Sequence, residues 1–134
     1  MEVNKFATPH FKWDELRCKG CDGSCSWSVN GKPLVSVTES ALLKLEEMRV
    51  FLDVPMRINS ASRCPRHNSR VGGAPLSQHR ATLERGSTAF DVALTGRAPK
   101  EAVIAAAEAA GFGGIGINYR TFVHVDDRGR VARW

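Results

Sequence analysis

The stretch that decides the fold runs from Ser60 to Asp126, and it contains five short motifs: Ser60-Ala61-Ser62-Arg63, Gly72-Gly73-Ala74, Ser77-Gln78-His79, Ala89-Phe90-Asp91 and Phe122-Val123-His124-Val125-Asp126. Three of these residues, His79, Asp91 and His124, have side chains that bind metals. They lie in or beside short runs of apolar or small residues. Because such runs form strands whose side chains alternate between two faces, a sheet can direct all three side chains into one cleft. The stretch therefore indicates a zinc hydrolase site on a sheet.

The segments around this stretch predict two helices and a small sheet. Ser36-Val37-Thr38-Glu39 has the pattern of a capping box and predicts a helix that extends to about Leu52. A second helix is expected at 100–110, between Pro99 and Gly111. Strands are expected at 56–60, 89–94, 113–117 and 122–126, and residues 131–134 are expected to return as a hairpin. The predicted fold is α+β, with a small, largely antiparallel sheet flanked by two main helices and the zinc site in a cleft on the sheet.

The composition limits the classes of protein to consider. The 134 residues, 43% of them hydrophobic, fit a single domain over 1–134 with one modest core. No apolar run is long enough to span a membrane, and the first residues lack the pattern of a signal peptide. We therefore expect synthesis in the cytoplasm, with action elsewhere after lysis or as part of a particle. The net charge of +5 favours an anionic partner such as a cell wall. Because no dense block of Lys and Arg occurs, no nucleic-acid partner is expected.

Histidine, aspartate and histidine together suit a catalytic zinc site. Such sites use three protein ligands and keep one position for water, whose pKa the metal lowers to about 7. His124 and Asp126 are two positions apart on a predicted strand, so they face the same side. One can bind the metal while the other acts as a base or as a partner of a ligand. A histidine in an apolar strand is also often just buried and hydrogen-bonded, so spacing alone leaves both interpretations open.

The order of the motifs resembles the D-alanyl-D-alanine carboxypeptidase family of zinc peptidases, in the short single-domain form common among bacteriophage and bacterial wall enzymes. The matching segments, within about 11–134, are Ser60–Arg63, His67-Asn68, Gly72–Ala74, Ser77–His79, Ala89–Asp91, Gly114–Gly116, Phe122–Asp126 and Arg133-Trp134. The resemblance implies a Zn²⁺ ion bound by His79, Asp91 and His124. It also implies that Arg63 holds the substrate carboxylate or the oxyanion. Ser77 and Asp126 would support the ligands, bind substrate or take part in catalysis.

The resemblance also implies a substrate, because the family cleaves the stem peptides of peptidoglycan. The expected activity is that of a D,D-carboxypeptidase or endopeptidase. The protein is expected to be a monomer and to act as a phage lysis enzyme or as part of a phage particle. The alternatives are a catalytically inactive wall-binding or virion structural module, and a peptidase of free D-Ala-D-Ala. Related members place an acid shortly before the last histidine, where this chain has Tyr119, Arg120 and Thr121. Asp126 is then either the general base or a carboxylate that orients a histidine ligand.

One segment departs from the family pattern. His79 and Asp91 are twelve positions apart, several more than the resemblance leads us to expect. The additional residues lie within Arg80–Ser87, where Glu84 offers a further acid or base. They could form a loop beside the cleft, which would alter the substrate specificity. Alternatively, they indicate that the metal site is weakened or lost. The loop is the preferred interpretation, because loops accept insertions at little cost in free energy.

Four cysteines predict a second, structural metal site. Cys18, Cys21, Cys25 and Cys64 could supply four thiolate ligands and anchor a loop rich in glycine and serine. Without a signal peptide, metal binding suits them better than disulfides. Disulfide pairs and unmodified thiols remain the alternatives.

Overall fold

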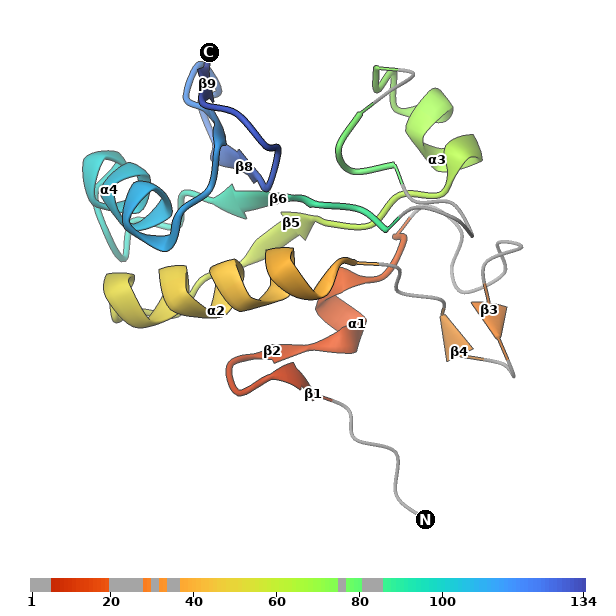
Figure 1. Cartoon of the computed structure of the whole chain (residues 1–134), viewed down its shortest axis with the longest axis horizontal. Coiled ribbons are helices and arrows are strands. Elements are labelled where there is room, and N and C mark those ends of the chain that lie inside the picture. The colour runs from red at the N-terminus through yellow and green to blue at the C-terminus, as the bar shows by residue number, and fades with distance from the viewer. Residues whose placement is uncertain (1–5, 20–27, 30–31, 34–36, 75–76, 81–85) are drawn as a thin grey trace.

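The computed structural model describes residues 6–19, 28–29, 32–33, 37–74, 77–80 and 86–134 (Figure 1). The elements of the described residues, in chain order, are β1 (Phe6–Thr8), β2 (Phe11–Lys12), α1 (Trp13–Leu16), β3 (Ser28–Val29), β4 (Lys32–Pro33), α2 (Glu39–Leu52), β5 (Ile58–Ser60), α3 (Pro65–Arg70), β6 (Ala89–Ala93), α4 (Lys100–Ala110), β7 (Gly114–Gly116), β8 (Phe122–Asp126) and β9 (Ala132–Arg133). The α+β class predicted from the sequence is confirmed.

The central sheet has five strands in the order β5-β6-β8-β7-β9. Its neighbouring strands are antiparallel except β7 and β9, which are parallel, so the prediction of a largely antiparallel sheet is confirmed. The predicted hairpin at the end of the chain is wrong: β9 pairs with β7, not with β8. The physical reason is that both edges of β8 are already occupied, by β6 and by β7.

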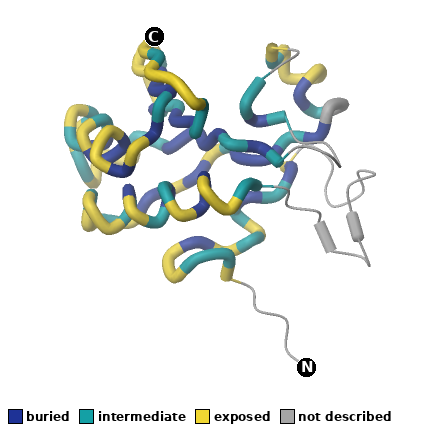
Figure 2. The backbone as a smooth tube through the Cα atoms, viewed as in Figure 1, coloured by how far each residue is buried: buried dark blue, intermediate teal, exposed yellow. Residues whose placement is uncertain are grey.

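Side-chain alternation divides this sheet into a core face and a cleft face. On the core face lie Phe90, Val92, Ile115, Val123 and Val125, all at most 1% exposed. They form one cluster with the inner sides of the two long helices, which contribute Ala41, Leu42, Leu45, Met48, Val103, Ala106, Ala107 and Ala110. Figure 2 shows these helices buried towards the sheet and exposed on their outer sides. Burying each large apolar side chain contributes ~1.5–3 kcal/mol, so this cluster holds the sheet in place beneath the cleft.

The ends of the two long helices lie at capping residues, and one of these differs from the predicted cap. The N-cap of α2 is Thr38, whose hydroxyl accepts a hydrogen bond from the Ala41 backbone N–H at 3.3 Å. The predicted cap at Ser36 is therefore wrong, because a hydroxyl closer to the first turn takes that role; Ser36 itself lies outside the described residues. The second long helix, α4, runs over the predicted residues and ends at Gly111, whose φ of 92° is the left-handed conformation that glycine adopts most readily.

A short helix, α3, was not predicted. It begins at Pro65, and the Cys64 sulfur accepts a hydrogen bond from the His67 backbone N–H at its first turn. Proline at the first helical position favours such a start. Its six residues are too few to show a helical period in the sequence.

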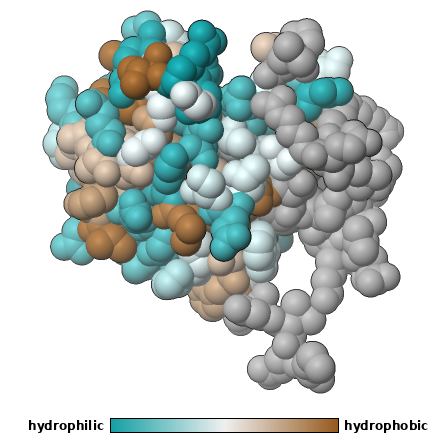
Figure 3. All heavy atoms as spheres, viewed as in Figure 1, coloured by the Kyte–Doolittle hydropathy of each residue, from teal (hydrophilic) through white to brown (hydrophobic). Residues whose placement is uncertain are grey.

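No helix within the described ranges is both long and apolar enough to cross a bilayer. The exposed apolar side chains include Leu43, Val50 and Phe51 of α2. On the face of the molecule seen in Figure 3, hydrophobic residues are dispersed among hydrophilic ones. This pattern is normal for a surface and indicates no particular function by itself.

Candidate metal centre

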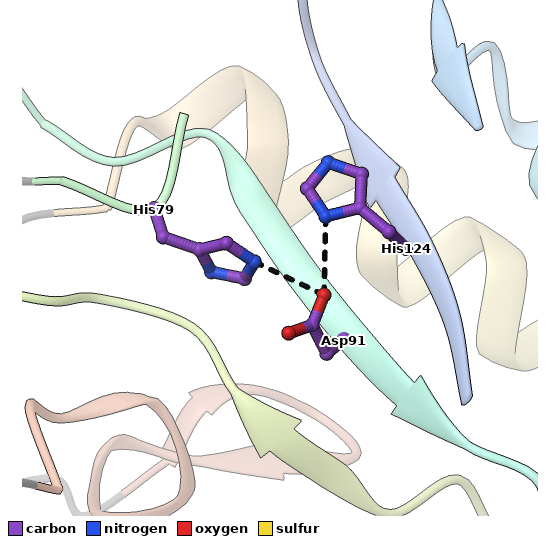
Figure 4. A group of neighbouring side chains, drawn as sticks. All are labelled: His79, Asp91 and His124. Carbon is purple, nitrogen blue, oxygen red and sulfur yellow. Dashed lines mark hydrogen bonds and ion pairs between the residues drawn. The ribbon is translucent and has the colours of Figure 1, made fainter. Parts of the chain in front are cut away.

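The pairing of β6 with β8 brings two of the predicted ligands together. Asp91 is the direct register partner of His124, and both side chains lie on the cleft face. Asp91 Oδ1 is 3.1 Å from His124 Nδ1 and 3.0 Å from His79 Nε2, so both rings point at the same oxygen (Figure 4). The ligand atoms of the three residues all lie within 4.8 Å of one another. The structure thus gathers the predicted triad at one point.

His79 reaches this point from a connecting segment rather than from a strand. Its carbonyl accepts a hydrogen bond from the Arg63 N–H at 2.8 Å, and its own N–H donates to Ser77 Oγ at 3.2 Å. On its other side, the Thr88 N–H donates to the Gln78 carbonyl at 2.9 Å. Residues 81–85, in the departure from the family pattern, lie outside the described residues. The additional length does not separate His79 from Asp91.

Hydrogen bonds assign the protons of both histidine rings. His79 Nδ1 lies 2.7 Å from the Ala61 carbonyl oxygen, which can only accept, so Nδ1 donates and Nε2 keeps a lone pair. His124 Nε2 lies 2.7 Å from Asp126 Oδ2 and donates to that carboxylate, which leaves a lone pair on Nδ1. Both lone pairs are directed at Asp91 Oδ1, itself an acceptor. Three acceptors that converge in this way suit a bound cation, and two imidazoles with one carboxylate suit zinc.

The charges around the triad keep Asp91 ionised. Burial alone would raise the pKa of Asp91, but its close contacts with the imidazoles of His124 and His79, which favour the charged carboxylate, hold it well below the usual range of a carboxyl group. Arg63 adds a third contact, with Nη2 at 3.5 Å from Asp91 Oδ2. Burial would lower the pKa of His124, and its bonds to Asp126 and Asp91 raise it instead. An anionic Asp91 is available as a metal ligand.

Asp126 is fully buried beneath His124, and both of its oxygens are occupied. Oδ1 accepts from the Arg128 backbone N–H at 3.2 Å and from Nε at 2.7 Å. Oδ2 accepts from Arg128 Nη2 at 2.7 Å and from His124 Nε2. Despite burial, these bonds from Arg128 and His124 hold the pKa of Asp126 well below its usual range. The carboxylate therefore fixes the orientation and tautomer of the His124 ring.

A cavity of about 570 Å³ opens above the triad. The described residues that line it are Arg63, Gly73, Ala74, Ser77, Gln78, His79, Asp91, Tyr119, Phe122, His124, Arg128, Arg130 and Trp134. They include the predicted substrate-binding residues Arg63 and Ser77 but not Asp126. Arg63 is held by Ser60 Oγ at 3.1 Å and by Asn68 Oδ1 at 3.4 Å. The volume lies in the range of small-ligand sites and can take a short peptide segment.

Sequence reasoning assigned no role to Arg128, Tyr119 or Trp134, all of which line the cavity. A signal for them was present in Gly114-Ile115-Gly116, whose two glycines face the cleft. A Cβ at Gly114 would overlap the Asp126 carboxylate. A Cβ at Gly116 would lie 2.7 Å from Trp134 Nε1 and 2.9 Å from Tyr119 Cε2. Each glycine thus makes room for a side-chain pair beside the ligands.

Two of the four cysteines lie together, away from the cavity. Cys18 and Cys64 are buried, and the Cys64 backbone N–H donates to the Cys18 sulfur at 3.5 Å. Cys21 and Cys25 lie outside the described residues. The four-cysteine metal site stays a prediction, and the contact ties the segment after α1 to the start of α3.

Comparison with known proteins places this geometry in a family. Residues 9–126, most of the chain, match the family described as Peptidase M15. No curated protein is similar enough to match the chain. The matched family consists of zinc-dependent peptidases and includes the D-Ala-D-Ala carboxypeptidases. Its metal requirement agrees with the triad of His79, Asp91 and His124. The chain therefore belongs to the M15 family of zinc peptidases.

Proposed function

We propose that the chain hydrolyses the stem peptides of peptidoglycan, as a zinc-dependent D,D-carboxypeptidase or endopeptidase. The observation that carries this proposal is the convergence of His79 Nε2 and His124 Nδ1 on Asp91 in a cavity that Arg63 also lines. When bound, zinc polarises the scissile carbonyl and activates a water molecule. Family membership supports the reaction class, and the resemblance to wall-cleaving members supports the substrate.

The chain's own residues divide the work as follows. His79, Asp91 and His124 hold the metal, and their protein partners keep both rings in the tautomers that leave a lone pair for it. Arg63 presents a guanidinium to the cavity, which suits the terminal carboxylate of a stem peptide or the oxyanion. The Ser77 hydroxyl oxygen accepts a hydrogen bond from the His79 N–H, so the hydroxyl proton can be donated to a bound peptide.

For Asp126 the contacts favour orientation of His124 over the role of general base. A general base needs a free lone pair within reach of the reacting proton. Both oxygens of Asp126 accept hydrogen bonds from Arg128, one of them also from His124, and the residue has 0% exposure. We therefore propose that Asp126 acts through His124.

The setting follows from charge and resemblance. A net charge of +5 suits an anionic wall. We propose that the protein acts as a monomeric, single-domain enzyme on the wall, after host lysis or as part of a phage particle, with no nucleic-acid partner.

One observation favours a second function, that of a wall-binding or virion structural module without activity. Among the described residues that line the cavity, Asp91 is the only carboxylate, and it faces both histidine ligands. Such a module would retain zinc and bind peptidoglycan without cleaving it.

Digestion of purified peptidoglycan separates these functions. Zinc-loaded protein is incubated with peptidoglycan of several cross-link chemotypes, and the products are identified by mass spectrometry. We expect released D-alanine or cleaved stem peptides, and no product after chelation or with His124→Ala. Zinc binding without product from any chemotype would favour the inactive module. Cleavage that survives His124→Ala would contradict the site.

A further inference from the structure

The side chains of Tyr119 and Trp134 form a hydrogen-bonded pair on one wall of the cavity. Trp134 Nε1 donates to the Tyr119 hydroxyl oxygen at 3.0 Å. Because the indole N–H can only donate, the phenol oxygen must accept, and the phenol's own proton points elsewhere. No described residue accepts that proton. Within the described part of the chain, the pair therefore presents an O–H donor without a protein acceptor, and water or a bound molecule can accept its proton.

Neighbouring contacts fix where this donor lies. The Tyr119 ring stacks on Phe122, with ring centroids 4.4 Å apart and an interplanar angle of 18°. Lys100 Nζ donates to the Tyr119 carbonyl at 3.2 Å. On the other side, the Trp134 ring lies 4.6 Å from the Arg128 guanidinium carbon. An aromatic pair held from both sides loses little entropy when it binds a ligand, which is what preorganisation requires.

The pair also lies next to the metal ligands. The Trp134 ring centroid is 5.1 Å from that of His124, and Gly116, which leaves the space for the pair, is the register partner of His124. Tyr119, Trp134 and all three ligands line the same cavity. A peptide bound over the triad would therefore meet the free phenolic proton.

We propose that Tyr119 is a catalytic residue that donates a hydrogen bond to the oxygen of the scissile carbonyl as negative charge develops on it. Trp134 is a positioning residue that acts through the Tyr119 hydroxyl. The proposal rests on the peptidase function proposed above. No proton is transferred: the O–H bond stays intact, and the hydrogen bond strengthens as charge accumulates on the substrate oxygen. The pair supplies a donor from the last part of the chain, whereas Arg63, which lines the same cavity, comes from the segment before α3.

Tyr119→Phe tests the proposal directly, because it keeps the ring on Phe122 and removes only the hydroxyl. We expect kcat for stem-peptide hydrolysis to fall about 100-fold, the scale of losing one oxyanion donor, with KM, zinc content and fold retained. Trp134→Phe, which removes the indole donor and keeps a smaller aromatic ring, is expected to lower kcat about tenfold. The double variant is expected to be no slower than Tyr119→Phe, because Trp134 acts through the hydroxyl that is already gone. Unchanged kcat in Tyr119→Phe overturns the proposal, and multiplied losses in the double variant overturn the role of Trp134.

A binding measurement separates this inference from the function on which it rests. The probe is a D-alanyl phosphinate dipeptide, whose phosphinyl oxygens stand in for the oxygens of the reacting centre, and its Kd for zinc-loaded protein is measured by calorimetry. Tyr119→Phe is expected to weaken binding about 10–100-fold relative to wild type, whether or not the wild type cleaves peptides. If the wild type binds the probe but cleaves nothing, the proposed function fails. The ratio of the Kd values of Tyr119→Phe and wild type then still tests whether Tyr119 donates a hydrogen bond. Equal Kd values, or no binding by the wild type, overturn the inference.

Discussion

The two parts of the metal centre are built differently. Asp91 and His124 lie on adjacent strands, within a ladder that pairs residues 89–93 with 122–126. His79 lies on a connection held by a hydrogen bond from the Arg63 N–H and, at Gln78, by two from Thr88. We call these the strand part and the connection part. A ladder fixes every side chain in register, whereas a loop accepts extra length at little cost in free energy. This difference explains how the chain lengthens between His79 and Asp91 without losing the triad.

The largest expected effect is common to both parts. His79→Ala and His124→Ala are each expected to remove zinc and to lower peptidase activity at least ~1000-fold, since metal activation contributes several kcal/mol to the transition state. Zinc content by mass spectrometry and stem-peptide hydrolysis are the measurements. His10→Ala is the matched control, because His10 is exposed and contacts Glu46, away from the cavity. Retained zinc and activity in His79→Ala would show that the connection part does not belong to the site.

The second prediction concerns the folding of the strand part. Gly114→Ala places a methyl group on the Asp126 carboxylate, so we expect a loss of ~2 kcal/mol of unfolding free energy from overpacking. Gly129→Ala is the control, because no atom of the described residues, its chain neighbours aside, lies within 4 Å of the added Cβ and the backbone there is not left-handed. Chemical denaturation of both variants provides the comparison. Equal stability would mean that the strand part is more adaptable than the ladder implies.

A smaller effect is expected from the groups that support the ligands. Asp126→Asn weakens the acceptor of His124 Nε2 and leaves the Arg128 charge without its partner, so zinc affinity should fall ~10–100-fold. Ser77→Ala removes one neutral hydrogen bond to the His79 N–H, worth ~1 kcal/mol, so the fall should be about fivefold. Competition with a zinc chelator measures both. A larger loss in Ser77→Ala than in Asp126→Asn would mean that support of the connection part, and not of the strand part, dominates zinc affinity.

The same difference explains what the sequence could predict. Alternation in Ala89–Ala93 and Phe122–Asp126 is a local pattern, so both strands and the side of the sheet that Asp91 and His124 face could be inferred from it. The pairing of β9 with β7 could not, because it depends on which strand edges remain unoccupied after the sheet has formed. The contacts of Arg128 and Trp134 likewise depend on the path of the chain after β8. Only Gly114 and Gly116 hinted at them, as positions where other side chains approach the backbone.

The most direct test of the triad is an anomalous difference map at the zinc edge from crystals of zinc-loaded protein. The account predicts a peak about 2.0–2.2 Å from His79 Nε2, His124 Nδ1 and an Asp91 carboxylate oxygen. It predicts this peak whether or not a second one occurs near Cys18 and Cys64. No peak among the three residues, or coordination through His79 Nδ1 or His124 Nε2, would contradict it.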